Sequence, residues 1–534
     1  MKRFDILFFI LIAVSMIVFQ SCADKFLDLE PKTNRLEANS YQTEEDAFNA
    51  MIAVYDALAV QPWNFVPLQS DIFSDDAYCG GEQGGGMWQW QDQEISIIDA
   101  ENGAARDLWN RCYSGVYRAN MFLKKEPDID WQTNGLRSRL HAEVIVLRAY
   151  FYWDLVRHYG WIPIIKELLP SSEDYKNIKQ NTPEEVYDFI AGKLVQVLPD
   201  LPETVPDSEK GRITRDVVRV LLARIYMLYE GFGKPVLGCE GNLQANSAEI
   251  TEQYIIDALE EIISSGRYHL LDNYADVFAW DNENNEESVF EWQYSEKSYS
   301  DDWGGWSVDG NMSVIFLGPR NPNPDTEYSA GWSFSTVSWS LVDEFEEADS
   351  VRRNVTVFNA DEELISYTKS YQNTGYFNHK YMPRTAYLPV NGAPELNWPK
   401  NYIDMRYAEI LLMAAELYLD QDQGKALEYL NEVRTRALGD DAALSSVTLD
   451  AIYHERRVEL ACEGHRKWDL LRRSLDYAKE KIDESWDIPS GLDNADDFIG
   501  REFRTDTYGM LPIPGDEIRL ANEGVLQQYV PAFQ

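Results

Sequence analysis

Four pairs of segments carry apolar residues at the i, i+3, i+4 and i+7 positions that line one face of a helix. These pairs span residues 43–59 with 105–123, 137–159 with a segment that begins at Thr182, 214–230 with 251–265, and 402–419 with 424–437. The fourth pair fills about 35 residues, which is the period of a tetratricopeptide repeat. The pattern predicts a mainly α fold in which four tetratricopeptide-like helix pairs stack into a scaffold.

Several of these helices carry recognisable boundary signals. Thr43 precedes three acidic residues, as expected of an N-cap and first turn. Thr182 precedes Pro183, and proline is favoured at the first position of a helix. Gly160 stands where the second pair's first helix should stop.

Two long segments between the helical blocks lack a helical period. Residues 61–104 are rich in Gly, Gln, Asp and Trp, and residues 267–400 carry many Gly, Asn, Pro, Trp and Tyr. Loops of this size inside a folded body are usually functional. We therefore expect one domain over residues 41–534, divided as follows: a helical scaffold at 41–60, 105–266 and 402–475, a loop-rich ligand face at 61–104 and 267–400, and a C-terminal segment at 476–534.

The N-terminus carries a targeting signal. Lys2 and Arg3 precede an apolar run from Ile6 to Phe19, which is too short for a membrane span and suits a signal peptide. Cys22 directly follows this run, as in a bacterial lipoprotein. We expect residues 1–21 to be removed, Cys22 to be acylated, and residues 22–40 to act as a tether. The alternative is plain secretion with an unmodified cysteine.

Composition excludes some functions. Lys and Arg number 48 against 90 Asp and Glu, giving a formal net charge of −42. A surface this acidic repels phosphate backbones, so nucleic acid is not an expected partner. The five cysteines form no CxxC pair and the six histidines are scattered, so neither a zinc site nor another cofactor is expected.

Several motifs occur in a fixed order along the chain. They are LRAYFYWDLVRHYGWIPII at 147–165, SWSLVDEFEEADSVRRNVTVF at 338–358, YIDMRYAEILLMAAELYL at 402–419, HERRVELACEGHRKWDLLRR at 454–473, and the LPIP element within 508–529. Together with Cys22 these motifs resemble the SusD/RagB family of lipoproteins, and the resemblance extends from Cys22 to the C-terminus.

The resemblance implies a glycan-binding lipoprotein of the outer membrane, exposed on the cell surface and without enzyme activity. Such a protein would capture an oligosaccharide or polysaccharide and deliver it, as a lid, to a SusC-like TonB-dependent transporter. Two alternatives stay open: an interaction scaffold of the transporter with little glycan affinity of its own, and a binder of a non-glycan nutrient. A glycosidase is disfavoured, because no barrel pattern or nucleophile elbow is present.

Sugars have apolar C–H faces, so binding them requires flat aromatic platforms and a few directed polar groups. The candidate ligand-binding residues lie in the two loop-rich segments: Asp76, Tyr78, Trp88, Trp90, Trp292, Trp303 and Trp306. Trp88 and Trp90 would face the same side if their segment alternates like a strand. Asp75 and Asp76 would accept hydrogen bonds from hydroxyl groups, or would instead cap the following turn.

Other residues of the motifs are expected to be structural. Their i, i+3 and i+6 spacings suit buried ion pairs between helices: Arg148, Tyr152, Asp154, Glu463, Arg466, Asp469 and Arg472. Trp332 and Trp339 are also expected to be structural. The negative charge of the whole chain favours a neutral glycan over a polyanionic one.

Overall fold

The computed structural model of the chain contains all eight helices that the sequence pattern predicts. It describes residues 41–60, 65–82, 85, 87–246, 248–299, 301–303, 308–484, 488–498 and 500–534. The paired helices are α2 (Glu44–Ala59) with α5 (Gly103–Lys125), α6 (Leu136–Tyr159) with α8 (Pro183–Val197), α9 (Arg215–Leu228) with α10 (Glu252–Ile263), and α16 (Tyr407–Tyr418) with α17 (Gln423–Leu438). Within each pair the two helices pack against each other, and the mainly α fold is confirmed.

The residues predicted to mark helix boundaries do so in the structure. Thr43 and Asp46 form a capping box at the start of α2, and Thr182 and Glu185 form another at the start of α8. Gly160 ends α6 with a φ of +71°, a conformation that only glycine adopts without strain.

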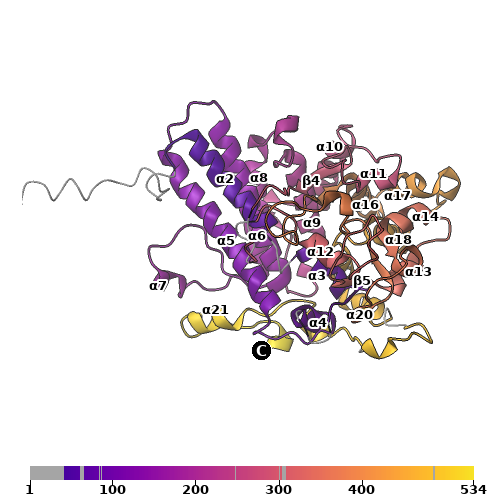
Figure 1. Cartoon of the computed structure of the whole chain (residues 1–534). Helices are drawn as coiled ribbons and strands as arrows, with labels where there is room; N and C mark the ends of the chain where they lie inside the picture. Colours follow the sequence, from indigo (N-terminus) through magenta and orange to yellow (C-terminus); the bar gives the residue numbers. More distant parts are fainter. Residues whose placement is uncertain are drawn as a thin grey trace, which may run out of the picture.

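Helix α6 lies at the centre of the first two helix pairs, because it packs against α2, α5 and α8. Figure 1 shows α2, α5, α6 and α8 side by side at one end of the molecule, with α16, α17 and α18 (Leu449–Leu460) toward the other. Every side chain of α6 from residue 142 to 159 is buried, so this helix is surrounded by protein on all sides. One large apolar core connects the first helix pair to the C-terminal segment.

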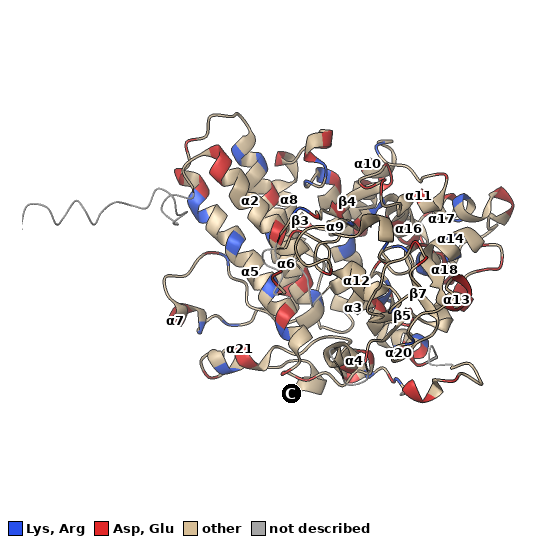
Figure 2. Cartoon of the chain, viewed as in Figure 1, with Lys and Arg blue, Asp and Glu red and all other residues tan. Residues whose placement is uncertain are grey.

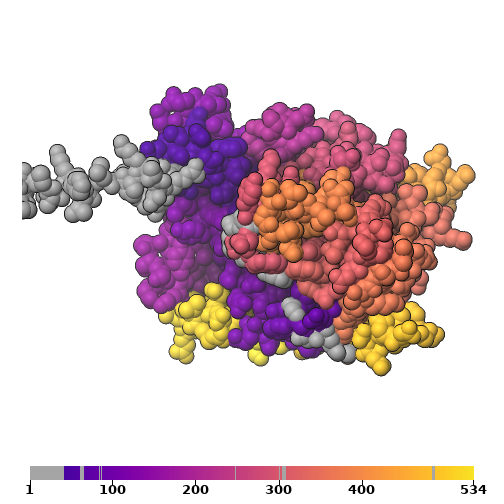
Figure 3. All heavy atoms as spheres, in the orientation of Figure 1, coloured from indigo at the N-terminus to yellow at the C-terminus, as the bar shows by residue number. Residues whose placement is uncertain are grey.

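The two segments predicted to be loop-rich contain short helices and strands. The helices are α3 (Val66–Phe73), α4 (Trp88–Glu94), α11 (Tyr274–Val277), α12 (Ser313–Leu317), α13 (Trp339–Glu344), α14 (Ser350–Thr356) and α15 (Ala360–Glu363). The remaining short helices are α7 (Ser172–Tyr175), α19 (Arg466–Arg473), α20 (Leu475–Glu484) and α21 (Gly515–Leu520). In Figure 3 the segments from about residue 270 to 400, pink to orange, cover one side of the visible face beside the violet N-terminal helices.

A four-stranded antiparallel sheet connects the two loop-rich segments. Its strand order is β1 (Ala77–Cys79), β5 (Ser335–Val337), β7 (Tyr376–Asn378) and β6 (Val357–Asn359), with Ala77 opposite Val337. A second, two-stranded sheet joins β2 (Gln244–Ala245) to β3 (Ala248–Glu249).

A third sheet shows that one predicted helix boundary is wrong. Residues 402–406 were expected to open a helix, but they form strand β8 (Tyr402–Arg406), which pairs with β4 (Ser288–Trp292). All five residues of β8 are buried, including Asp404 and Arg406, so the strand shows no alternation of buried and exposed positions. Helix α16 begins directly afterwards, at Tyr407.

Within the described residues, no helix combines the length and the apolar character that crossing a membrane requires. The same residues contain no cluster of three or more His, Cys, Asp or Glu side chains suited to a metal ion. The four cysteines that the structure describes are buried and free, so Cys79 and Cys112 are not paired.

Candidate functional site

Two of the predicted tryptophans present their rings at the surface. Trp303 and Trp88 are each 42% exposed. The ring of Trp303 stacks on that of Trp332, with 6.1 Å between centroids and 8° between ring planes. This near-parallel arrangement holds one ring over the other, so the Trp303 ring is fixed in orientation although it is exposed.

The Trp303 ring belongs to a larger aromatic cluster, which comprises Trp90, Trp303, Phe316, Trp332 and Phe334. Trp332 contacts Phe316 at 5.7 Å and Phe334 at 5.4 Å between centroids. Trp90 contacts Phe316 at 5.6 Å and Phe334 at 6.4 Å. The cluster therefore connects α4, the helix that carries Trp88, to the segment that carries Trp303.

Polar groups lie next to the aromatic cluster. The Arg320 Nε donates a hydrogen bond to the Trp332 carbonyl at 2.9 Å, and Arg320 Nη1 lies 3.6 Å from a Glu82 carboxylate oxygen. The Glu82 side chain is largely exposed, so both a cation and an anion are available beside the stacked rings. Sequence reasoning missed Glu82, because its partner is more than 200 positions away and no local pattern joins them.

A cavity of about 310 Å³ lies at the base of the segment that carries Trp303. The backbone N–H of Ser295 donates to the Asp309 carbonyl at 2.8 Å and closes this segment into a loop. Ser295, Val308 and Asp309 line the cavity together with residues of α2 and β4. Such a volume is at the lower end of the range for small-molecule pockets.

The prediction that Trp88 and Trp90 face the same side is wrong. Their segment is helix α4, in which residues two positions apart point to nearly opposite sides. Trp88 accordingly points outward, whereas Trp90 is buried in the aromatic cluster. A short run of alternating Trp and Gln is compatible with either element, and the packing of Trp90 against Phe316 and Phe334 decides between them.

Asp76 is also buried, which corrects the prediction that it is open to a ligand. Its Oδ1 accepts from Arg457 Nε at 3.0 Å, and neighbouring Asp75 accepts from Arg466 at 2.7 and 2.8 Å. Burial, reinforced by the charge of Asp75, raises the pKa of Asp76 to about 6. The pKa of Asp75 is lowered despite burial, because Arg457 and Arg466 both face it.

Tyr78 and Trp292 are buried for a different reason, since both fill the apolar core. Tyr78 lies 5.3 Å from Phe498 between ring centroids, with the Arg501 guanidinium 5.1 Å from its own ring. Trp292 lies on β4 and packs on Tyr402 at 5.0 Å. Neither side chain presents a ring face to solvent. Of the other predicted residues, Trp306 and Cys22 lie outside the described residues.

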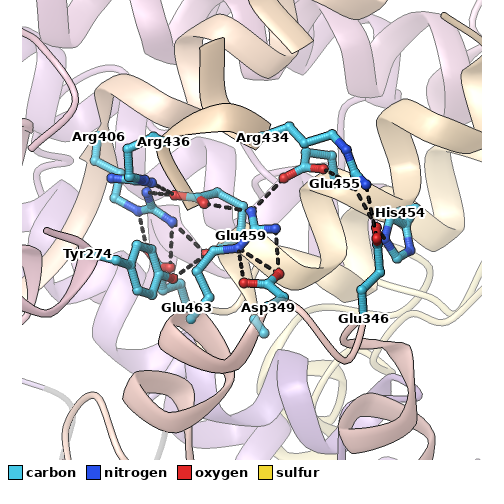
Figure 4. Close-up of polar contacts among 12 residues, drawn as sticks. Tyr274, Glu346, Asp349, Arg406, Arg434, Arg436, His454, Glu455, Glu459 and Glu463 are labelled. Atoms are coloured by element: carbon cyan, nitrogen blue, oxygen red, sulfur yellow. Dashed lines mark hydrogen bonds and ion pairs between the residues drawn. The ribbon is translucent and has the colours of Figure 1, made fainter. Parts of the chain in front are cut away.

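Glu463, one of the motif residues expected to form ion pairs, belongs to a buried network of arginines and carboxylates (Figure 4). Arg406 contacts three carboxylates: Glu287 at 2.8 Å, Glu459 at 2.6 Å and Glu463 at 2.7 Å. Arg352 binds Glu455 at 2.5 Å and Glu459 at 3.0 Å. The pKa of Glu459 is lowered against the effect of burial, because Arg436, Arg406 and Arg352 surround it.

The remaining motif residues have protein partners as well. Their contacts are Asp154 with Arg111 at 2.6 Å, Asp469 with Arg456 and with Arg472, both at 2.9 Å, Arg148 with Asn120 at 2.6 Å, and the Tyr152 hydroxyl with the Ile165 carbonyl at 3.0 Å. Asp154, Asp469 and Arg472 thus form the expected ion pairs, whereas Arg148 and Tyr152 form hydrogen bonds to an amide and a carbonyl instead.

The pair formed by His454 and Glu344 predicts a pH dependence of stability. His454 Nδ1 lies 2.6 Å from Glu344 Oε1, and this hydrogen bond raises the pKa of His454 against the effect of burial. Burial opposes ionisation of Glu344, but the contacts with His454 and Arg457 lower its pKa to about 2. Glu344 is therefore ionised near neutral pH, and only His454 titrates there.

Because the folded-state pKa of His454 is raised, the stability that this pair contributes is complete below the unfolded-state pKa of about 6.5. It is lost as pH rises through the folded-state pKa. We expect the thermal midpoint to fall across that interval by a larger amount in the unaltered protein than in His454→Gln. Thermal melts from about pH 5.5 to about pH 8.5 measure this difference, and parallel curves for the two proteins would contradict it.

The surface around these sites is dominated by acidic residues. Figure 2 shows Asp and Glu distributed over the helices from α2 to α21, in line with the net charge of −42. Many of the arginines are instead buried in ion pairs such as those of Arg352 and Arg406. These buried cations are matched by buried carboxylates, so the excess of negative charge lies at the surface.

Comparison with known protein families gives a match in both the N-terminal and the C-terminal part of the chain. Residues 347–531 match the sequence profile of the SusD family, and residues 25–227 match the profile described as starch-binding associating with outer membrane. A SusD-like protein of Bacteroides ovatus is 27% identical over 489 residues, which cover 86% of this chain and 81% of that protein.

Solved structures agree with these matches. Surface glycan-binding protein A from Bacteroides thetaiotaomicron, in complex with laminarihexaose, superposes with a TM-score of 0.77 at 29% identity, over 92% of this chain and 100% of that one. A laminarin binding SusD-like protein superposes with a TM-score of 0.76 at 30% identity, over 91% of this chain and 100% of that one.

Proposed function

The chain belongs to the SusD family, and from this membership we propose that it binds a glycan at the outer membrane and delivers it, as a lid, to a SusC-like TonB-dependent transporter. The profile match that names outer-membrane association supports the location. The laminarihexaose bound by one structural relative supports the ligand class. The protein would bind the glycan without hydrolysing it.

The observation that carries this proposal is the stacked pair of Trp303 and Trp332. An exposed indole that is already fixed in orientation offers a flat apolar face to the C–H side of a sugar ring at little entropic cost. Arg320 and Glu82 beside it supply a donor and an acceptor for hydroxyl groups. Trp88 on α4 would add a second platform, joined to the first through the aromatic cluster.

Replacing Trp303 by alanine is expected to weaken glycan binding by about 10- to 70-fold. Covering roughly 100 Å² of sugar face at 25 cal/mol/Å² is worth at most about 2.5 kcal/mol, which sets the upper limit of this loss. Isothermal titration calorimetry of residues 23–534 with laminarihexaose measures it, preceded by affinity electrophoresis in gels that contain different polysaccharides. Neutral glucans are the first candidates, since the acidic surface repels polyanions.

Tyr117→Ala is the matched control, because Tyr117 is an exposed aromatic residue on α5 rather than on the loop-rich side. It should leave the affinity unchanged. Equal loss in both variants would indicate a general effect on folding. Unchanged affinity in Trp303→Ala and in Trp88→Ala would move the site away from the aromatic cluster.

A second function is consistent with the same fold: a scaffold for the transporter with little glycan affinity of its own. Absence of binding to every polysaccharide tested, combined with co-purification of the transporter, would favour it. A non-glycan nutrient is the remaining alternative. In each case we propose that acylated Cys22 anchors the chain to the outer membrane and that residues 22–40 act as the tether.

A further inference from the structure

A second, more polar cavity lies in the interior, away from the aromatic cluster. Its volume is about 70 Å³, and helices α6, α9, α16 and α19 form its walls with strands β4 and β8. Three tryptophans from different elements line it: Trp153 of α6, Trp292 of β4 and Trp468 of α19. Four arginines and four carboxylates complete the polar part of the lining: Arg157, Arg224, Arg456, Arg472, Asp404, Glu409, Glu463 and Asp469.

Four N–H groups of the residues that line this cavity have no acceptor among the residues that the structure describes. They are the indole Nε1 of Trp153, Trp292 and Trp468, and Nη1 of Arg456. Each of these side chains is at least nine-tenths buried. An unpaired buried donor costs about 1–3 kcal/mol, so an acceptor in the cavity that reaches several of these N–H groups would stabilise the fold.

The acceptors that line the cavity are already in use. Asp404 accepts from the Tyr150 hydroxyl and from Arg224, both at 2.9 Å. Arg224 also donates to the two oxygens of Glu409, at 2.8 and 2.7 Å. Asp469 accepts from Arg456 and Arg472, and Glu463 accepts from Arg406 and Lys380. Among the described residues that line the cavity, the buried side-chain atoms that make no hydrogen bond are all nitrogen donors.

This imbalance distinguishes an anion from water. A water molecule offers two acceptor sites but must also donate two hydrogens, whereas an anion accepts without donating. The positive charges of the four arginines equal the negative charges of the four carboxylates. An added anion would therefore be attracted by the unpaired N–H groups and not by a net positive charge of the lining.

We propose that this cavity is a binding site for a small monovalent anion of halide size, held by Trp153, Trp292, Trp468 and Arg456. A water-sized site needs only about 10–15 Å³, so 70 Å³ accommodates a halide ion with a few water molecules but not a sugar ring. The site joins α6, β4 and α19, and its anion would stabilise the contacts among these three elements.

Crystals of the unaltered protein grown in sodium bromide test the assignment directly. The expected result is an anomalous peak within hydrogen-bonding distance of at least two of the three indole nitrogens. In solution, the thermal midpoint should rise with chloride at constant ionic strength, with sodium gluconate as the substituting salt because gluconate is too large for the cavity.

The matched variants are Trp468→Phe, which removes one N–H of the cavity, and Trp398→Phe. Trp398 is equally buried and has an unpaired Nε1, but it does not line this cavity. Trp468→Phe should lose the chloride-dependent rise, and Trp398→Phe should keep it. If Trp468→Phe does not fold, the bromide measurement alone decides. Water density without an anomalous peak, with identical midpoints in chloride and gluconate, would overturn the proposal.

Discussion

Replacing Arg406 with methionine is expected to lower the free energy of unfolding by about 3–5 kcal/mol. Arg406 is 1% exposed and contacts Glu287, Glu459 and Glu463, all of them buried. Methionine fills part of the volume of the arginine side chain, but it removes the positive charge that neutralises the three carboxylates. The cost is mainly the desolvation of charges that have lost their partner. Urea denaturation followed by tryptophan fluorescence measures it.

Arg504→Met is the control for this prediction. Arg504 pairs with Asp506 at 2.7 Å, but both side chains are nearly half exposed. An exposed pair of this kind contributes less than about 1 kcal/mol, so the unfolding midpoint should hardly move. Similar losses of unfolding free energy in the two variants would contradict the prediction, because they would show that burial of the Arg406 network does not increase the cost of breaking it.

Replacing Gly464 with alanine is the second large expected effect, at about 2–5 kcal/mol of unfolding free energy. Gly464 has a φ of +79°, where an alanine costs about 1–2 kcal/mol. A Cβ at this position would also stand 2.4 Å from the Cα of Pro67, so backbone would have to move. Overpacking of this kind adds about 1–3 kcal/mol. Thermal or urea unfolding measures the sum.

Gly135→Ala separates the two contributions. Gly135 has a similar φ of +77°, but a Cβ there meets no atom within 4 Å. This variant should therefore lose only about 1–2 kcal/mol, the cost of the backbone conformation. An equal loss at both positions would mean that the approach of Pro67 to Gly464 contributes nothing.

Local signals in the sequence were sufficient to predict the helices. The periodicity of α2, α6, α9 and α17 extends over three or more turns, and Thr43 and Thr182 mark two starts with capping boxes. Shorter elements were not predictable in this way. Strand β8 has five residues and is buried on both faces, so its pattern does not differ from the first turns of a buried helix.

Sequence reasoning did not predict which of the candidate site residues are exposed. Trp88 and Trp303 are exposed as a platform requires, whereas Trp90, Trp292, Tyr78 and Asp76 are buried. Whether a tryptophan packs inward depends on partners that are distant in sequence, such as Phe316 for Trp90. Asp76 likewise has its counter-ion at Arg457, 381 positions away, and no spacing rule relates the two.

The long sequence separation between these partners has a consequence for how the chain reaches its native state. Asp75 and Arg466 are 391 positions apart, and the Ser338 hydroxyl bonds the Asp75 carbonyl across 263 positions. An N-terminal fragment released before the α18–α19 region has been synthesised would hold two aspartates without counter-ions, and one released before β5 would also leave strand β1 unpaired. Contacts of such high contact order close late and make folding slow. The segment from Asp75 to Cys79 therefore completes its structure only after nearly the whole polypeptide is available.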